Sequence, residues 1–231
     1  MHANFTYDKF DEQYDTQLYV PISDNVQRVL TRSFFHPRPS DELRHYRLRH
    51  NFLTASNVAA VLGMNPYCTI QTIMDKYMRP FSPAPDNYFT KRGKDMEPFI
   101  AQKFVRSTKI PCIHNQGLVQ HRTYKFLGAT FDLLTHTGIP VEIKCLVKRV
   151  PKQDEVMPKM YWVQCQIQMQ VAESPFCYYV EYKERTETES EFFNIIVINR
   201  DDDWFYQVVP ILERFWNTVT EYRSYFGKSL F

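Results

Sequence analysis

The chain has 231 residues, 44% of them hydrophobic, and includes 18 Phe, 15 Tyr and 3 Trp. This length favours one large domain, and so many apolar residues exclude general disorder. No run approaches the roughly 18 apolar residues of a membrane-spanning helix. The start of the chain, which carries Asp8, Asp11, Glu12 and Asp15, lacks the basic and apolar regions of a signal peptide. We therefore expect a soluble intracellular globular protein.

The net charge of +2 hides an uneven distribution of charged residues. Residues 24–159 contain 21 Lys and Arg against 11 Asp and Glu, whereas residues 160–231 contain 6 against 11. The basic residues gather in three stretches, which are Arg44, Arg47 and Arg49, then Lys91, Arg92 and Lys94, then Lys144, Lys148, Arg149 and Lys152. One such stretch is usually just a solvated face, but three in one segment favour a surface that binds nucleic acid.

The cysteines and histidines indicate no structural metal site. The five cysteines are odd in number and widely spaced, and no two form a Cys-x-x-Cys pair. A disulfide framework or zinc ribbon is therefore not expected, and the thiols should be reduced and buried. The seven histidines show no paired spacing, so a histidine metal site is not expected either.

The first half of the chain is predicted to be mainly helical. Residues 1–39 read as a loosely ordered extension that ends in a Pro-rich breaker, and residues 40–231 as one domain. Helices are predicted over 40–50, 56–62, 70–78 and 96–107, and a Pro-rich linker over 79–86. The helix over 56–62 should end at Gly63, and Ile100 and Phe104 mark the buried face of the helix over 96–107.

The second half adds strands, and so the fold class is mixed α/β (α+β). Strands are predicted over 117–120, 125–133, 139–147, 176–183 and 192–198. The acidic run 184–191 should form an exposed hairpin tip, and an amphipathic helix should cover 204–225. Interleaved helices and strands predict a sheet covered by helices.

One predicted hairpin places two acidic residues opposite each other. Residues 136–138 fit a three-residue loop with Gly138 in the left-handed conformation. If the loop centres on Thr137, Asp132 lies directly across from Glu142. Two carboxylates about 5 Å apart would repel by roughly 3 kcal/mol at an effective dielectric constant of about 20. A sheet would not keep such a pair without a cation between them.

Alternation along the strand places Lys144 on the same face as Glu142. An all-oxygen site suits Mg²⁺, which binds one or two carboxylates, water and phosphate. Such a metal would polarise a phosphoryl oxygen and activate a water, while the lysine would steady the attacking hydroxide or the transition state. An ordinary surface hairpin with an Asp–Lys pair is the alternative that this spacing leaves open.

Together these motifs resemble the PD-(D/E)XK nuclease superfamily and, within it, the phage lambda exonuclease branch of YqaJ-type viral recombinases. The resemblance covers roughly residues 40–225 and rests on five motifs in order. They are Arg49 with Leu53-Thr54-Ala55-Ser56, Arg92-Gly93-Lys94-Asp95-Met96-Glu97, Asp132 with Glu142-Ile143-Lys144, Tyr161-Trp162-Val163-Gln164-Cys165-Gln166, and Ile196-Val197-Ile198 with Arg200-Asp201. The resemblance implies a central mixed sheet flanked by helices.

The chain departs from the family pattern in two places. The family's proline before the metal-binding aspartate is Phe131 here, which should alter the local turn but not the ligand. Residues 163–171 alternate apolar residues with four glutamines, a period typical of a strand. We nevertheless expect the family's helix there, because glutamine is a good helix former and the order of elements fits.

The resemblance implies a metal site with two Mg²⁺ ions, which Mn²⁺ could replace. Asp132, Glu142 and the backbone carbonyl of Ile143 would bind metal, and Glu97 would hold a second metal or its water. The alternative for Glu97, which directly precedes Pro98, is a charge favoured by the dipole at a helix start.

Two further side chains complete the active site that the resemblance implies. Lys144 would position or activate the nucleophilic water, and Gln164 would orient Lys144 or the scissile phosphate. The alternative for Gln164 is a plain position on a helix surface.

The resemblance also implies a subsite for the 5′-terminal phosphate, formed by Arg49 and Ser56. An Arg fork and a helix start both bind anions. The alternative for Arg49 is a surface ion pair with Asp41 or Glu42. The residues expected along the DNA backbone are Arg47, Arg92, Lys94, Lys148 and Arg149.

The predicted function is that of a Mg²⁺-dependent 5′-to-3′ exonuclease on double-stranded DNA ends, which would produce single strand for recombination. The alternatives are an endonuclease or RNA-cleaving relative, and a non-catalytic DNA-end-binding recombination protein. A single-strand annealing or single-strand-binding partner is expected, and a homo-oligomer stays open. No membrane partner is expected; if the chain is viral, it would act in the host cytoplasm or nucleus.

Overall fold

The computed structural model describes residues 21–34, 42–82, 85, 87–114, 116–147 and 157–230. Its helices are α1 (Asp24–Leu30), α2 (Glu42–Arg49), α3 (Ala55–Val61), α4 (Ile70–Met78), α5 (Tyr88–Thr108), α6 (Lys159–Ala172) and α7 (Asp202–Leu230). Its strands are β1 (Ser33–Phe34), β2 (Leu53–Thr54), β3 (Cys112–Ile113), β4 (Leu118–Gln120), β5 (Leu127–Ala129), β6 (Leu133–Thr135), β7 (Pro140–Cys145), β8 (Phe176–Lys183) and β9 (Phe192–Asn199). The fold is therefore mixed α/β, as the sequence predicts.

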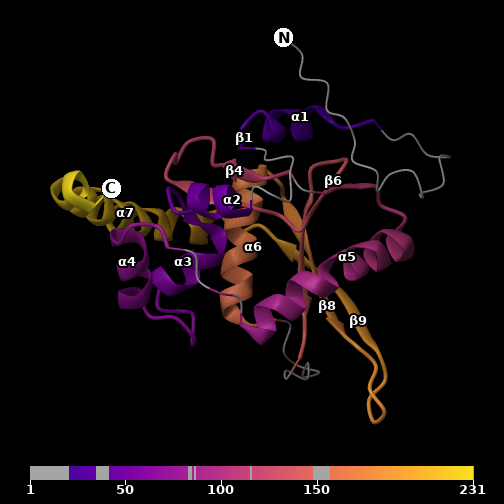
Figure 1. Cartoon of the computed structure of the whole chain (residues 1–231). Helices are drawn as coiled ribbons and strands as arrows, with labels where there is room; N and C mark the ends of the chain where they lie inside the picture. Colours follow the sequence, from indigo (N-terminus) through magenta and orange to yellow (C-terminus); the bar gives the residue numbers. More distant parts are fainter. Residues whose placement is uncertain are drawn as a thin grey trace.

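The strands form two mixed sheets, with the orders β1-β4-β5-β2 and β3-β6-β7-β8-β9. In the five-stranded sheet, β7 pairs with β6 antiparallel and with β8 parallel. Helices α5 and α6 cover its two faces (Figure 1): Phe104 of α5 packs with Val141, whereas Met169 of α6 packs with Tyr179. Successive residues of β7 therefore face different helices, and its even-numbered residues face α6.

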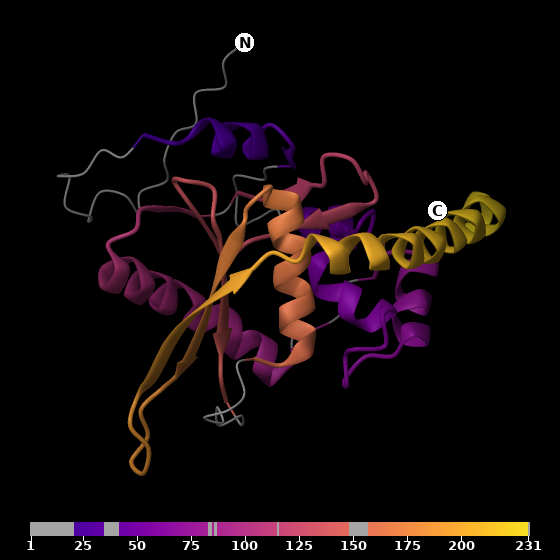
Figure 2. The same cartoon turned by 180° about the vertical axis from the view of Figure 1, so that it is seen from behind.

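A second core joins the four-stranded sheet to the helices around it. It contains Ile167 of α6, Ala59 of α3, Ile73 of α4 and Leu212 of α7. Figure 2 shows α7 running away from α6 and past α3 and α4. Helix α6 contributes to both cores, so it fixes the two sheets relative to each other.

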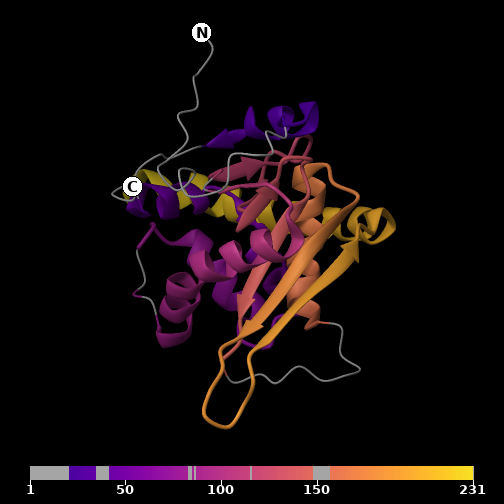
Figure 3. The ribbon, with the colours of Figure 1, turned by 90° about the vertical axis from the view of Figure 1, so that its right-hand side faces the viewer.

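The β8–β9 hairpin projects beyond the helices (Figure 3), and its acidic tip lies at the far end. Two ion pairs tie this hairpin to α5. Arg92 contacts Glu184 at 2.5 Å, and Lys103 contacts Glu191 at 2.9 Å. The exposed tip is as the sequence predicts, but its attachment to α5 depends on contacts between distant segments.

Helix α5 starts eight residues earlier than the sequence predicts. Asn87 caps it by accepting a hydrogen bond from the Thr90 amide at 2.9 Å, and Pro98 lies inside the helix. The prediction started the helix near Pro98 because proline is favoured in a first turn. Glu97 therefore lies in mid-helix, so a role as a helix-start charge is wrong.

The strand predicted over 125–133 is two strands in different sheets. β5 ends at Ala129 and pairs with β4 and β2, whereas β6 begins at Leu133 and pairs with β3 and β7. The chain crosses between the sheets at residues 130–132. Asp132 lies in this crossing segment.

The glutamine-rich segment is helical, as the family resemblance implies, and forms part of α6. Its four glutamines divide into two pairs with i, i+4 spacing. Gln164 and Gln168 donate to Glu142. Gln166 donates to Asn199 at the end of β9, and Gln170 donates to Asp202 at the start of α7. Glutamines thus lie on two faces of a buried helix. This arrangement explains why apolar and polar residues alternate in the sequence with the period typical of a strand.

The segment from 21 to 34 is more ordered than the sequence predicts. Val26 and Val29 of α1 are fully buried, and β1 pairs with β4. The Arg32 guanidinium donates to the carbonyl of Val171 at the end of α6 and pairs with Glu173 at 2.7 Å. Residues 1–20 lie outside the described part, so the domain boundary at 39 stays a prediction.

All five cysteines lie within the described residues and are free thiols. Cys165 and Cys177 are buried, and the other three are partly exposed, so the prediction of burial is correct for two of the five. None of the described helices combines the length and the apolar character needed to cross a bilayer.

Candidate active site

The β6–β7 hairpin has the predicted register. Leu133 pairs with Val141, which places Asp132 across from Glu142 at the next position. The Gly138 amide donates to the Thr135 carbonyl at 2.9 Å, and Gly138 has a φ of +89°. The three-residue loop with a left-handed glycine is therefore confirmed.

Glu142 is the centre of the site and is 2% exposed. Its Oε1 accepts hydrogen bonds from the Lys144 ammonium and from Gln164 Nε2, the latter at 2.7 Å. Its Oε2 accepts from Gln168 Nε2 at 2.6 Å. The carboxylate thus has three donors, of which one is charged. Gln164 is not a plain helix-surface residue.

Asp132 is held against β7 by one backbone hydrogen bond. Its Oδ2 accepts from the Ile143 amide at 2.6 Å. Burial raises the pKa of Asp132 well above its ordinary value, and the neighbouring Glu142 and Glu97 carboxylates raise it further. Lys144 and the Ile143 amide act in the opposite direction but do not cancel this effect.

Glu97 reaches the same site from α5. Burial raises the pKa of Glu97, and the charge of Glu142 adds to the increase. Lys144 and Lys94 partly offset it. The structure therefore brings Glu97, Asp132 and Glu142 close enough for their charges to repel one another.

Lys144 remains charged in this environment. Burial lowers its pKa, but the Glu142 and Asp132 carboxylates raise it by more, and the net shift is upward. Its Nζ also lies 4.9 Å from the centre of the Tyr161 ring. A lysine held as a cation is suited to stabilising negative charge rather than to accepting a proton.

The residues present fit a hard divalent cation. The candidate ligands are carboxylate and backbone oxygens, which Mg²⁺ and Mn²⁺ prefer. A cation between Asp132, Glu142 and Glu97 would relieve the repulsion that raises the pKa of Asp132. No described group of three His, Cys, Asp or Glu side chains is arranged tightly enough to enclose a metal unaided, so water and phosphate oxygens would complete the coordination.

The predicted phosphate residues Arg49 and Ser56 lie together. Arg49 Nη2 donates to Ser56 Oγ at 3.2 Å, and Ser56 Oγ lies 3.3 Å from Thr54 Oγ1. Thr54 caps α3 without a hydrogen bond from its side chain to the helix amides. Amides at a helix start without a side-chain cap are suited to binding an anion.

Lys76 on α4 belongs to this group, and the sequence analysis missed it. Desolvation lowers the pKa of Lys76, and the positive charge of Arg49 lowers it further. Two cations that repel each other indicate a site that an anion would stabilise. No local pattern distinguishes Lys76 from other helical lysines, whereas Gln168 could have been found from its i+4 spacing to Gln164.

The residues predicted to contact the DNA backbone have different surroundings. The Arg47 guanidinium lies 6.0 Å from the centre of the Phe81 ring, and Lys94 Nζ lies 5.2 Å from that of Tyr46. Arg92 is paired with Glu184. Lys148 and Arg149 lie outside the described residues.

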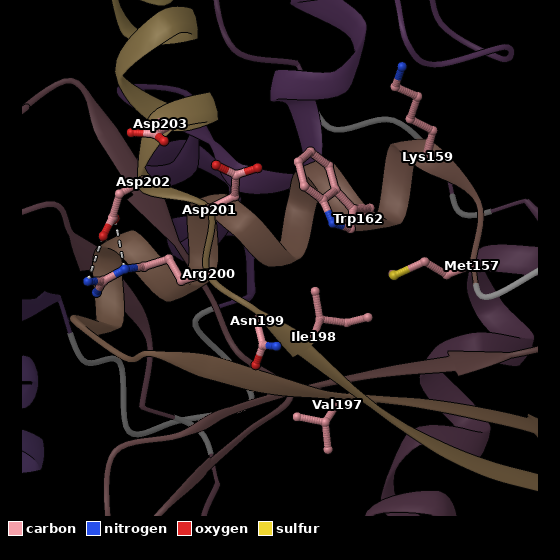
Figure 4. Close-up of a pocket in the computed structure, with 10 residues that line it drawn as sticks. All are labelled: Met157, Lys159, Trp162, Val197, Ile198, Asn199, Arg200, Asp201, Asp202 and Asp203. Atoms are coloured by element: carbon pink, nitrogen blue, oxygen red, sulfur yellow. Dashed lines mark hydrogen bonds and ion pairs between the residues drawn. The ribbon is translucent and has the colours of Figure 1, made fainter.

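An open pocket of about 900 Å³ lies away from this site (Figure 4). Its lining includes Trp162 on α6, Ile198 on β9 and three consecutive aspartates, Asp201, Asp202 and Asp203. Trp162 is two residues before Gln164 and so points from the opposite side of the helix. Lys159 and Arg200 also line the pocket, and Arg200 pairs with Asp202 at 2.9 Å, but the three aspartates leave the lining net negative, which disfavours a phosphate backbone.

The model of the YqaJ-like viral recombinase domain matches residues 44–175, more than half of the chain. The chain belongs to the YqaJ-like viral recombinase family. The matched range includes every residue assigned above to the metal and phosphate sites. No curated protein shows a matching sequence.

Solved structures show that this YqaJ-like chain has the PD-(D/E)XK nuclease fold. It is similar to the alkaline exonuclease LHK-Exo from Laribacter hongkongensis, with a TM-score of 0.65, 23% identity, and coverage of 80% of this chain and 96% of that one. The complex of LHK-Exo with dAMP gives 0.66 at 23% identity, covering 81% and 97%. A phage related exonuclease from Haemophilus somnus 129PT gives 0.50 at 11% identity, covering 78% and 96%.

Proposed function

We propose that this protein is a Mg²⁺-dependent exonuclease that digests one strand of duplex DNA from a 5′ end. The observation that carries the proposal is the position of Asp132 across from Glu142, with Lys144 bonded to Glu142 and Glu97 nearby. Membership of the YqaJ-like family and the exonuclease names of the similar structures support this reaction class.

Asp132, Glu142 and the Ile143 carbonyl would hold one metal ion, and Glu97 would hold a second or its water. Mg²⁺, or Mn²⁺ in its place, would polarise the scissile phosphate and lower the pKa of a bound water. Gln164 orients the Glu142 carboxylate from α6. Lys144, kept protonated by the acidic residues, stabilises the negative charge that grows on the phosphate as water attacks.

The 5′ polarity would come from Arg49, Ser56 and Lys76. An end-directed enzyme must recognise a feature that internal phosphodiesters lack, and a terminal phosphate has additional negative charge. The Arg49 fork can bind two phosphate oxygens, and Ser56 beside it can donate another hydrogen bond. Lys76 adds a second positive charge to the same place.

Basic residues outside these sites would follow the sugar-phosphate backbone without reading sequence. Arg47, which lies over the Phe81 ring, and Lys94, which lies over the Tyr46 ring, are the described candidates outside the contact with the hairpin tip that Arg92 makes. The single strand left by digestion would then pass to a single-strand annealing or single-strand-binding protein.

Matched linear duplexes test this proposal. Three substrates are compared with Mg²⁺ and with EDTA: a duplex with 5′-phosphate ends, one with 5′-hydroxyl ends, and a closed circle. We expect Mg²⁺-dependent release of nucleotides from 5′-labelled strands, faster on phosphorylated ends, and no cutting of the circle. Efficient cutting of the circle would indicate an endonuclease, and binding to ends without any cleavage would indicate a non-catalytic end-binding protein.

A further inference from the structure

Gln168 is a completely buried amide at the inner side of the site. It lies one helical turn after Gln164, on the face of α6 that meets β7. Its Nε2 donates to Glu142 Oε2 at 2.6 Å and to the Thr130 carbonyl at 3.0 Å. One side chain therefore contacts both the central carboxylate and the segment that leads to Asp132.

The orientation of the Gln168 amide is fixed by these two bonds. A primary amide nitrogen carries two hydrogens, and both have an acceptor here. Turning the amide over would place Oε1 against the Glu142 carboxylate and the Thr130 carbonyl, and three acceptors would then repel one another. In the present orientation Oε1 is buried and has no partner among the described atoms. An unpaired buried acceptor destabilises a fold. That the amide nevertheless keeps this orientation indicates that its Nε2 group, with its two hydrogen bonds, is the part that serves the site.

Glu142 receives different donors on its two oxygens. Lys144 and Gln164 contact Oε1, whereas Gln168 alone among the described donors contacts Oε2. Without Gln168, Oε2 would have no described donor, and the carboxylate would be held against rotation about its last bond through Oε1 alone. A neutral donor also leaves Glu142 its full negative charge, which a second cation would partly cancel.

We propose that Gln168 is a positioning residue that locks the rotation of the Glu142 carboxylate and its distance from the segment carrying Asp132. The inference rests on the proposed function, because it concerns the alignment of the two principal metal ligands. Partners of this kind typically change metal affinity by about 10- to 100-fold when they are removed.

Gln166 provides a matched control on the same helix. It is also fully buried, donates to the Asn199 carbonyl at 2.9 Å and accepts from the Asp201 amide at 2.8 Å. Its described hydrogen bonds do not include one to Glu142, and it points from the opposite side of α6. Gln166→Leu thus removes two buried hydrogen bonds, as Gln168→Leu does, but leaves the site intact.

The experiment compares wild type, Gln168→Leu, Gln168→Met and Gln166→Leu. Two readouts are used: the Mg²⁺ concentration that half-maximally raises the melting temperature, and kcat and KM on a 5′-phosphorylated duplex. We expect both Gln168 variants to need roughly 10-fold or more Mg²⁺ and to lose roughly 10-fold or more in kcat, with KM for DNA within about twofold. Gln166→Leu should lower the melting temperature without changing the Mg²⁺ requirement.

Equal Mg²⁺ requirements in the Gln168 variants and wild type would overturn the inference. So would failure of both Gln168 variants to fold while Gln166→Leu folds, since Gln168 would then serve the fold alone. Neither result concerns the proposed function, which fails instead if wild type itself shows no Mg²⁺-dependent cleavage.

Discussion

The backbone amide of Ile143 donates to Oδ2 of Asp132 at 2.6 Å. This bond attaches the segment between the two sheets to the strand that carries Glu142 and Lys144. The Ile143 amide faces Asp132. The carbonyl of the same residue belongs to the same stretch of β7 and so lies next to the site. The relationship explains how Asp132, which lies outside any strand, is held in position for the ligand role proposed for it.

The first prediction concerns the two proposed metal ligands. Asp132→Asn or Glu142→Gln should reduce cleavage by at least about 10²-fold, because metal-assisted charge stabilisation is lost. DNA binding, measured by fluorescence anisotropy in EDTA, should be unchanged where the replaced carboxyl is already protonated and tighter where a negative charge facing phosphate is removed. The exposed Glu213→Gln on α7 is the control. Cleavage at the wild-type rate by either variant would refute the metal assignment.

The second prediction concerns Lys144. Replacing it with alanine should lower kcat by roughly 10²-fold, the usual loss for one electrostatic stabiliser, and leave KM nearly unchanged. Steady-state kinetics on a phosphorylated duplex measure both constants. Lys103→Ala, which removes an equal charge from α5, should keep kcat. A change confined to KM would mean that Lys144 only binds substrate.

The third prediction concerns the terminal phosphate. Arg49→Ala or Lys76→Ala should slow digestion of 5′-phosphorylated ends by about 10-fold or more and have less effect on 5′-hydroxyl ends, because charged hydrogen bonds to the phosphate are lost. The stabilisation of the fold by Mg²⁺ should be unaffected, since no metal ligand changes. Arg214→Ala on α7 serves as the charge-matched control. If both ends are digested equally fast by wild type, the subsite is assigned wrongly.

The fourth prediction concerns stability and pH. Burial, together with Glu142 and Glu97, raises the pKa of Asp132, so the folded chain holds a proton that the unfolded chain has already lost. The free energy of unfolding should therefore fall as pH rises from about 3.9, the ordinary Asp value, to the raised value. In EDTA near neutral pH, Asp132→Asn should melt higher than wild type, by about 2–4 °C for each kcal/mol regained. A lower melting temperature for this variant would contradict the sign of the shift.

The fifth prediction concerns the ion pair between α5 and the hairpin. Glu184→Gln should release Arg92 for phosphate and tighten DNA binding by about twofold or more, with a steeper dependence on salt. Glu189→Gln removes the same charge from the same hairpin but frees Lys183 instead. Equal effects of the two variants would mean that only net charge matters.

Local signals in the sequence predict the centre of the site well. The turn chemistry around Gly138 is sufficient to set the register of β6 and β7, and hence to place Asp132 across from Glu142. Gln164 follows once the segment is taken as a helix. These features depend on residues close together in the chain, where backbone geometry is the main determinant.

Features that depend on distant contacts could not be predicted in the same way. The break at residues 130–132 arises because β5 and β6 join different sheets, although the apolar pattern runs through both. The early start of α5 depends on Asn87 as a cap, upstream of a proline that favoured a later start. The sequence near Arg92 gives no sign of its acidic partner, because Glu184 is far away in the chain and contacts Arg92 only in the folded hairpin.

The Arg32 guanidinium, which donates to the carbonyl of Val171, has a practical consequence for work with shortened proteins. A chain trimmed to the family match at residues 44–175 would keep all the proposed metal and phosphate residues. It would lose this arginine and the buried valines of α1 at one end, and β8, β9 and α7 at the other. The end of α6 would then lack the Arg32 cation. We expect this helix, whose Gln164 and Gln168 donate to Glu142, to be less firmly held. The segment that matches the family therefore contains the proposed active-site residues but is shorter than the segment that must fold to hold them in place.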